Sequence, residues 1–175
     1  GFMAFNGATL LNYAAKSKEM WGVPCPVFVR AIAMEGGMGP VAGGMHHSSV
    51  ARMPGMPIFS PMTPREWTHT WHWFLRHDVP VYCSEHRRSF DLHSEMENVD
   101  DVEAHITVIA ISASRLNMIE AEQTLRGHGI RCNIFHLLWL KPFEPPEAML
   151  ESIKRSMVRY MCTQSNRDQL TSSLT

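Results

Sequence analysis

Apolar residues in the first part of the chain recur at helical spacing and then in short runs. The helical spacing predicts a helix that follows a short entry and ends at Gly22. The short runs, bounded by proline or polar residues, predict buried strands at residues 24–30, 56–60 and 79–84. Residues 34–55 are rich in glycine and show no apolar period, so a long loop is expected there.

A second helix has the clearest start signal in the sequence. Thr63 can cap it, Pro64 suits its first turn, and Glu66 completes a capping box. Apolar residues follow at positions i, i+4 and i+7, namely Trp67, Trp71 and Phe74. This pattern predicts one apolar face that packs on the core or on a neighbouring subunit, and a helix that ends near residue 77.

The second part of the chain begins after an acidic segment. Residues 91–103 hold six acidic side chains and little apolar material, as is typical of a linker. A β-branched run at 106–111, a helix at about 115–126 and an apolar run at 132–138 then fit one right-handed βαβ crossover. Pro145, Pro146 and Glu147 open a further helix that reaches Lys154.

These elements predict an α/β fold with mostly parallel sheets and helices on both faces. Two units are expected, at residues 1–90 and 104–175, joined by the acidic linker 91–103. With 175 residues, the chain is long enough for one full domain or two small ones.

Charge and cysteine content narrow the possible functions. The net charge is −1 without a basic block, so nucleic-acid binding has no electrostatic support. No apolar run approaches the length of a membrane span, and the first residues resemble neither a signal peptide nor a transit peptide. The four cysteines are far apart in sequence, which excludes a zinc knuckle or a redox pair and favours a reducing compartment.

Three groups of residues are candidates for a catalytic, metal-binding or structural role. His47 follows the glycine-rich segment, where a loop histidine bonded to nearby backbone is the ordinary alternative to a catalytic one. His69 and His72, three apart on the polar face of a helix, have metal-ligand spacing but no further ligands nearby, so a solvated face is expected. The segment 85–87, Glu-His-Arg, is expected to form an ion pair at a strand end.

A series of short motifs, in order along the chain, carries a family resemblance. The motifs include Phe2 to Asn6, Val27 to Arg30, His47-Ser48, Pro54 to Pro61, Glu85 to Arg87, Val108 to Ser112, Leu137 to Pro142 and Glu151 to Lys154. Together they resemble the beta subunit of the thiamine-diphosphate-dependent, decarboxylating component of 2-oxo-acid dehydrogenase complexes. The resemblance runs from Phe2 to about Tyr160 and implies a partial transketolase-like pyrimidine-binding domain followed by a partial transketolase C-terminal domain.

The resemblance implies oxidative decarboxylation of a 2-oxo acid on thiamine diphosphate, with acyl transfer to the lipoyl group of an acyltransferase component. The partner would be an alpha subunit that holds the magnesium ion and the diphosphate, in a heterotetramer. No Gly-Asp-Gly metal motif occurs in this chain, so no metal ligands are expected in it. The compartment would be the bacterial cytoplasm or the mitochondrial matrix.

Three site residues follow from the resemblance. It places an active-site histidine at His47, which could donate to the substrate carboxylate or to the 2-oxo oxygen. It also places Met3 and Phe5 against the pyrimidine ring of the cofactor. This chain departs from the family at Gly7, where an aromatic residue is usual, and His46 is an adjacent alternative to His47.

Two further interpretations remain open at this stage. The family's glutamate that bonds the aminopyrimidine ring would lie upstream of Gly1, so this chain alone is expected to be inactive. A non-catalytic, truncated paralogue that acts as a structural or assembly subunit fits the same pattern, and so does a fragment of a normal enzyme. The substrate, whether pyruvate, a branched-chain 2-oxo acid or acetoin, depends on a pocket that two chains would share.

Overall fold

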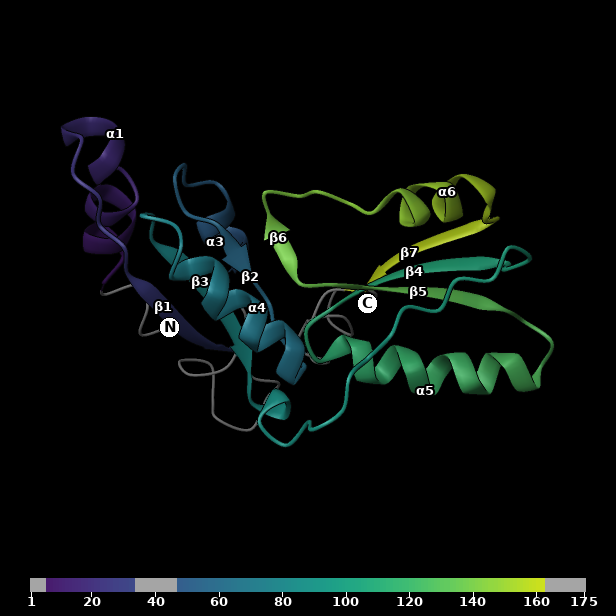
Figure 1. Cartoon of the computed structure of the whole chain (residues 1–175). Helices are drawn as coiled ribbons and strands as arrows, with labels where there is room; N and C mark the ends of the chain where they lie inside the picture. The colour runs from purple at the N-terminus through teal and green to yellow at the C-terminus, as the bar shows by residue number, and fades with distance from the viewer. Residues whose placement is uncertain (1–5, 34–46, 163–175) are drawn as a thin grey trace, which may run out of the picture.

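The computed structural model describes residues 6–33 and 47–162 (Figure 1). It opens with a π-helical segment, η2 (Ala8–Ala14), and a short helix, α1 (Ser17–Trp21). Gly22 ends α1 with a φ of 68°, a left-handed conformation that glycine adopts without strain. The predicted end of the first helix is therefore confirmed, although its backbone is not one regular α-helix.

The first sheet has four strands in the order β1-β3-β2-β6. The strands are β1 (Phe28–Ala33), β2 (Ile58–Phe59), β3 (Val81–His86) and β6 (Trp139–Lys141). Both β1 and β2 run parallel to β3, whereas β6 runs antiparallel to β2. All six residues of the central strand β3 are buried, in keeping with a strand covered on both faces.

A short helix, α3 (His47–Ala51), occupies part of the segment that we expected to be loop. The expectation was wrong for residues 47–51 and holds for residues 52–55, which form turns, while residues 34–46 lie outside the described part. Val50 is the buried residue of α3 and joins a core cluster that includes Ile58 and Tyr82. One buried valine leaves no detectable period in the sequence, which is why the helix was missed.

Helix α4 (Pro64–Phe74) begins as the sequence predicts. The Thr63 side chain accepts from the Glu66 backbone N–H, and the Glu66 carboxylate accepts in return from the Thr63 N–H. Trp71 of its apolar face stacks on Phe28 of β1, with ring centroids 4.1 Å apart. The apolar face therefore packs against the edge strand of the first sheet.

The second sheet has the order β5-β4-β7 and is parallel throughout. Its strands are β4 (Ile106–Ile111), β5 (Cys132–Leu137) and β7 (Val158–Cys162). Helices α5 (Ser114–Gly127) and α6 (Glu147–Arg155) lie on opposite faces of this sheet (Figure 1). The predicted βαβ crossover and the helix after Pro146 are confirmed, and so is the α/β class with mostly parallel sheets.

The acidic segment 91–103, which follows the 3₁₀ turn η3 (Arg87–Ser89), is tied to helix α4 and to the second sheet. Glu95 and Glu97 bind Arg65 at the start of α4, with a distance of 2.6 Å between Glu97 Oε1 and Arg65 Nη2. Val99 pairs with Ile134 along the outer edge of β5. The segment therefore covers an edge that would otherwise expose unpaired backbone groups. None of the described helices is long and apolar enough to cross a bilayer.

Gly55 makes the closest backbone approach among the described glycines. Its φ is +72°, and a Cβ placed there would lie 2.1 Å from the carbonyl oxygen of Ala15. We expect Gly55→Ala to lower the free energy of unfolding by about 1–3 kcal/mol, because both the backbone strain and the clash must be relieved. Denaturant titration measures this loss.

Gly22→Ala is the matched control for this prediction. Gly22 has a similar φ of +68°, but nothing lies within 4 Å of the added Cβ. Its alanine variant therefore carries only the strain of the left-handed conformation, about 1 kcal/mol. Equal losses at the two positions would show that the approach to Ala15 is unimportant.

Candidate functional site

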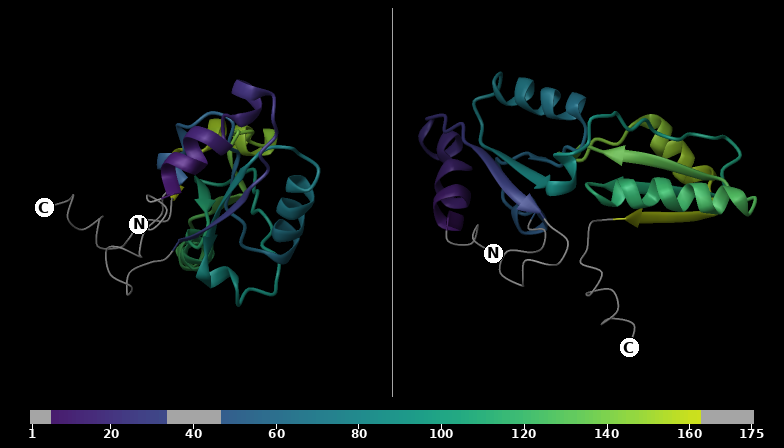
Figure 2. Two further views of the ribbon diagram at one scale, coloured as in Figure 1. Left: turned by 90° about the vertical axis from the view of Figure 1, so that its left-hand side faces the viewer. Right: turned by 90° about the horizontal axis from the view of Figure 1, so that it is seen from below.

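The two sheets meet where β6 from the second half of the chain joins β2 of the first (Figure 2). The Ser60 N–H donates to the Leu138 carbonyl at 2.8 Å just before β6 begins. Trp139 then packs on Phe59, with centroids 3.8 Å apart, and meets the edge of Trp73 from α4. The junction between the halves is therefore built from strand pairing and aromatic contact together.

A buried ion pair links the helices on either side of this junction. Arg115 near the start of α5 is fully buried and forms two hydrogen bonds to the Glu66 carboxylate of α4, at 2.6 and 2.7 Å. Burial would raise the pKa of Glu66, but the bonds and charge of Arg115, with the amides of Met62 and Thr63, hold that pKa below its ordinary range. Glu66 thus caps α4 and neutralises Arg115 at once.

His136 of β5 lies in the electrostatic field of this pair. Its backbone N–H donates to the Asn98 side chain at 2.9 Å, which fixes the strand beside the linker. Burial, reinforced by the positive charge of Arg115, lowers the pKa of the His136 imidazole to about 4. The ring is therefore neutral at pH 7, and no proton transfer at neutral pH is expected from it.

A second carboxylate lies toward the carboxyl end of β3. Glu85 is buried, and its Oε2 accepts from Arg30 Nε of β1 at 2.6 Å, while Arg30 Nη2 bonds the other carboxylate oxygen. The Arg30 guanidinium also lies 5.9 Å above the Trp67 ring. The Glu-His-Arg segment therefore contains an ion pair, as expected, but its arginine comes from β1 rather than from the segment itself.

His47 is the first residue of α3 and follows the segment that leaves the carboxyl end of β1. Its Nδ1 atom is buried and has no hydrogen-bond partner in the described part of the chain. Burial lowers the pKa of its imidazole, which favours the neutral ring at physiological pH. A neutral imidazole with one nitrogen unengaged can donate to or accept from a bound molecule.

The other predicted site residues lie outside the described part of the chain or on an exposed helix face. Met3 and Phe5 lie outside the described residues, so their placement against a cofactor stays a prediction. His69 and His72 are exposed on α4, as expected of a solvated face. Within residues 6–33 and 47–162, no group of three histidine, cysteine or acidic side chains could hold a metal ion.

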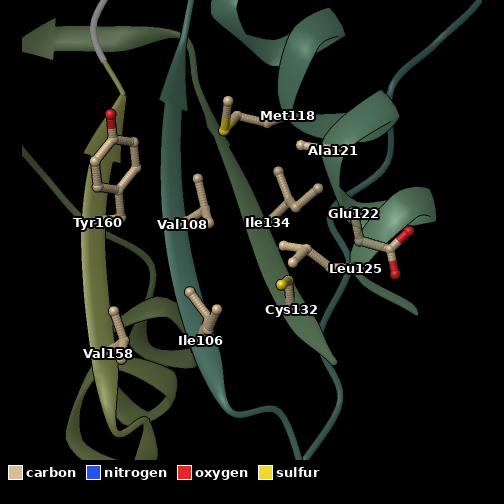
Figure 3. A pocket seen from close by; sticks show the side chains of 10 residues that line it. All are labelled: Ile106, Val108, Met118, Ala121, Glu122, Leu125, Cys132, Ile134, Val158 and Tyr160. Atoms are coloured by element: carbon tan, nitrogen blue, oxygen red, sulfur yellow. The ribbon is translucent and has the colours of Figure 1, made fainter. Parts of the chain in front are cut away.

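An apolar hollow of about 240 Å³ lies on the α5 side of the second sheet (Figure 3). Its walls come from β4, β5, β7 and α5, and its polar groups are the Glu122 carboxylate, the Cys132 thiol and the Tyr160 hydroxyl. Glu122 is paired with Arg126 at 2.5 Å, and burial raises the pKa of Cys132. The hollow therefore lacks an activated acid, base or nucleophile.

Several of these polar contacts leave no signal in the sequence. Arg115 was predicted as the first residue of a helix, and His136 as part of an apolar strand. Arg30 looked like the polar end of a strand. The partner residues lie 49 and 55 positions away in the Arg115–Glu66 and Arg30–Glu85 pairs, so only a fold or an alignment could have paired them.

Comparison with known structures identifies the fold class. A transketolase mutant from Pichia stipitis superposes with a TM-score of 0.70 at 13% identity, covering 99% of this chain and 30% of that one. The fold is therefore transketolase-like, as the motifs predicted. No protein-family model matches the chain.

Proteins related in sequence show which enzyme subunits the chain resembles. The pyruvate dehydrogenase E1 component subunit beta of Rickettsia bellii is 24% identical over 177 residues, covering 89% of this chain and 53% of the relative. The acetoin:2,6-dichlorophenolindophenol oxidoreductase subunit beta of Cupriavidus necator is 24% identical over 172 residues, covering 89% and 50%. The resemblance to these beta subunits is confirmed, and this chain spans about half of their length.

Proposed function

We propose that the chain acts as part of a beta subunit of a thiamine-diphosphate-dependent 2-oxo-acid dehydrogenase. One observation carries the proposal: the match to enzymes named as beta subunits covers 89% of the chain, through both of its halves. In this role the chain supplies the pyrimidine side of a cleft. An alpha subunit supplies the opposite side, the magnesium ion and the diphosphate contacts, in a heterotetramer. Bacterial relatives favour the cytoplasm as the location.

His47 is the residue that we propose for direct contact with the substrate. Thiamine diphosphate, when bound, stabilises the carbanion that forms when a 2-oxo acid loses carbon dioxide. The Nδ1 atom of His47, which is buried and has no hydrogen-bond partner among the described residues, fits a group that bonds a substrate oxygen. A neutral imidazole can donate one hydrogen bond to the substrate carboxylate or 2-oxo oxygen and hold it in place. Met3 and Phe5 are proposed to lie against the pyrimidine ring.

An activity assay tests this role. The beta subunit of which this chain is a part is co-expressed with an alpha subunit, and reduction of 2,6-dichlorophenolindophenol is followed with pyruvate, branched-chain 2-oxo acids or acetoin as substrate. We expect His47→Gln to lower kcat by about 10²-fold or more, as is usual when a positioned acid–base group is lost. The substrate with the highest kcat/KM identifies the substrate class.

Two histidines provide controls for this assay. His46→Gln changes the adjacent residue, and His69→Gln changes an exposed histidine on α4. Both are expected to keep wild-type kcat. Equal activity of wild type and His47→Gln would remove His47 from the active site. Turnover absent from every pairing would favour the other role, a non-catalytic subunit in the assembly that passes acyl groups to a lipoyl-bearing acyltransferase.

A further inference from the structure

Helix α3 is too short to fix the position of His47 by itself. It has five residues, and Val50 is its buried one. Isolated helices shorter than about 12 residues are marginal in water, because nucleation costs more than a few hydrogen bonds return. The position of the His47 ring therefore depends on what holds the segment that follows α3.

The segment between α3 and β2 is held at its two ends by backbone bonds. The Met53 N–H donates to the Val50 carbonyl at 2.9 Å and closes the last turn of α3. The Tyr82 N–H of β3 donates to the Pro57 carbonyl at 2.9 Å and fixes the entry into β2. Between these bonds, the carbonyl of Met53 accepts a hydrogen bond from outside the segment.

Lys141 supplies that donor from the second half of the chain. Its ammonium group donates to the Met53 carbonyl oxygen, 88 residues away in sequence. Strand pairing places it there, because Lys141 lies opposite Ile58 in the β2–β6 register. Burial lowers the pKa of its ammonium group, in keeping with a side chain drawn out of water. A charged donor near the carbonyl end of a helix is also electrostatically favourable.

We infer that Lys141 is a positioning residue for His47, through the bond by which β6 holds the loop after α3. The catalytic consequence rests on the proposed function. The structural claim does not depend on the proposed function. It says that Lys141, in the second half of the chain, fixes the conformation and the burial of the His47 imidazole in the first half.

Histidine titration by NMR on the full chain tests this inference without any assay of activity. The His47 resonance is assigned by its loss in His47→Gln. In Lys141→Met the loop is expected to loosen, so that the His47 ring is rehydrated and its pKa rises toward the ordinary value. Amide exchange at residues 50–53 is expected to become at least about tenfold faster. Lys141→Arg, which keeps a charged donor, should restore both properties in part.

Lys154→Met is the matched control. Lys154 is exposed on α6 and pairs with Glu151, so the same substitution there should change neither property. An unchanged His47 pKa in Lys141→Met would overturn the inference. A raised His47 pKa without faster amide exchange would overturn it too, because removal of the positive charge of Lys141 can raise that pKa without any loosening of the loop. If Lys141→Met fails to fold, Lys141→Gln, whose shorter amide cannot reach the carbonyl, is judged by the same two readouts.

The proposed function and the positioning role of Lys141 can be contradicted independently of each other. If the assembly shows no turnover but the His47 pKa and the exchange rates respond to Lys141→Met, Lys141 still positions α3. If His47→Gln abolishes turnover while Lys141→Met leaves the His47 pKa, the exchange rates and kcat unchanged, His47 is catalytic and Lys141 does not position it.

Discussion

Replacing Arg115 with methionine is expected to lower the free energy of unfolding by about 3–5 kcal/mol. Arg115 is fully buried, and its removal leaves the Glu66 carboxylate, which is mostly buried, without its countercharge. Among the described residues, the amides of Met62 and Thr63 then remain as donors to this carboxylate. Because Glu66 also caps α4, the loss should loosen the start of that helix and the junction together. Denaturant titration followed by tryptophan fluorescence reports both.

An exposed pair on α6 makes this prediction specific. Lys154 pairs with Glu151 three residues earlier, and the two side chains are 70% and 47% exposed. Lys154→Met should cost at most about 0.5 kcal/mol, because exposed helical pairs contribute little. The double variant Glu66→Gln with Arg115→Met should lose clearly less than the sum of the single variants, since each single variant leaves one buried charge without its partner and the double variant leaves none. Additive losses would show that the two side chains do not depend on each other.

Acidification from pH 7 to pH 4.5 is expected to remove roughly 2–3 kcal/mol of stability through His136 alone. In the folded chain its pKa is about 4, compared with 6.5 for an unperturbed histidine. The neutral form is therefore favoured in the fold. Above pH 6.5 both states are neutral and His136 adds no pH dependence. As the pH falls below 6.5 the unfolded chain gains a proton that the folded chain excludes, and the loss levels off below about pH 4.

His136→Phe keeps an aromatic ring and removes the titration. The free energy of unfolding of this variant should depend less steeply on pH between 6.5 and 4.5 than that of the wild type. Glu66, Arg115 and Glu97 are the charged groups that act on the His136 ring, and they remain in the variant. His69→Gln, at an exposed position, should leave the slope unchanged. If the free energy of unfolding fell equally with pH in the wild type and in His136→Phe, the pH dependence could not be assigned to His136.

The elements that the sequence predicted best are those specified by their own residues. The capping box of α4 involves Thr63 and Glu66, three positions apart, and the run at 106–111 is a strand throughout. By contrast, β6 has three residues and forms because β2, about 80 positions earlier, offers it an edge. Strand β7 was also missed, and α3 depends on a lysine from the other half. Long-range contacts of this kind leave no local pattern.

The candidate site, too, could be predicted from the sequence only where local residues specify it. The His-Ser pair at His47 could be found from motif order, because the family resemblance supplied it. The position of α3, the burial of Nδ1 and the contact from Lys141 to the following loop could not, since each depends on packing between segments distant in sequence. The ion pair of Arg115 with Glu66, which ties the two halves together, was likewise invisible in the sequence.

Cofactor binding to the chain with and without an alpha subunit is the most direct test of a cleft shared by two polypeptides. Thermal unfolding is followed with thiamine diphosphate and magnesium, each alone and together. A shared site predicts that the pair raises the Tm of the alpha–beta assembly, by an amount equivalent to about 3 kcal/mol at 100 times the dissociation constant, and leaves that of this chain alone unchanged. An assembly whose Tm does not respond, or an equal rise for the isolated chain, would contradict it.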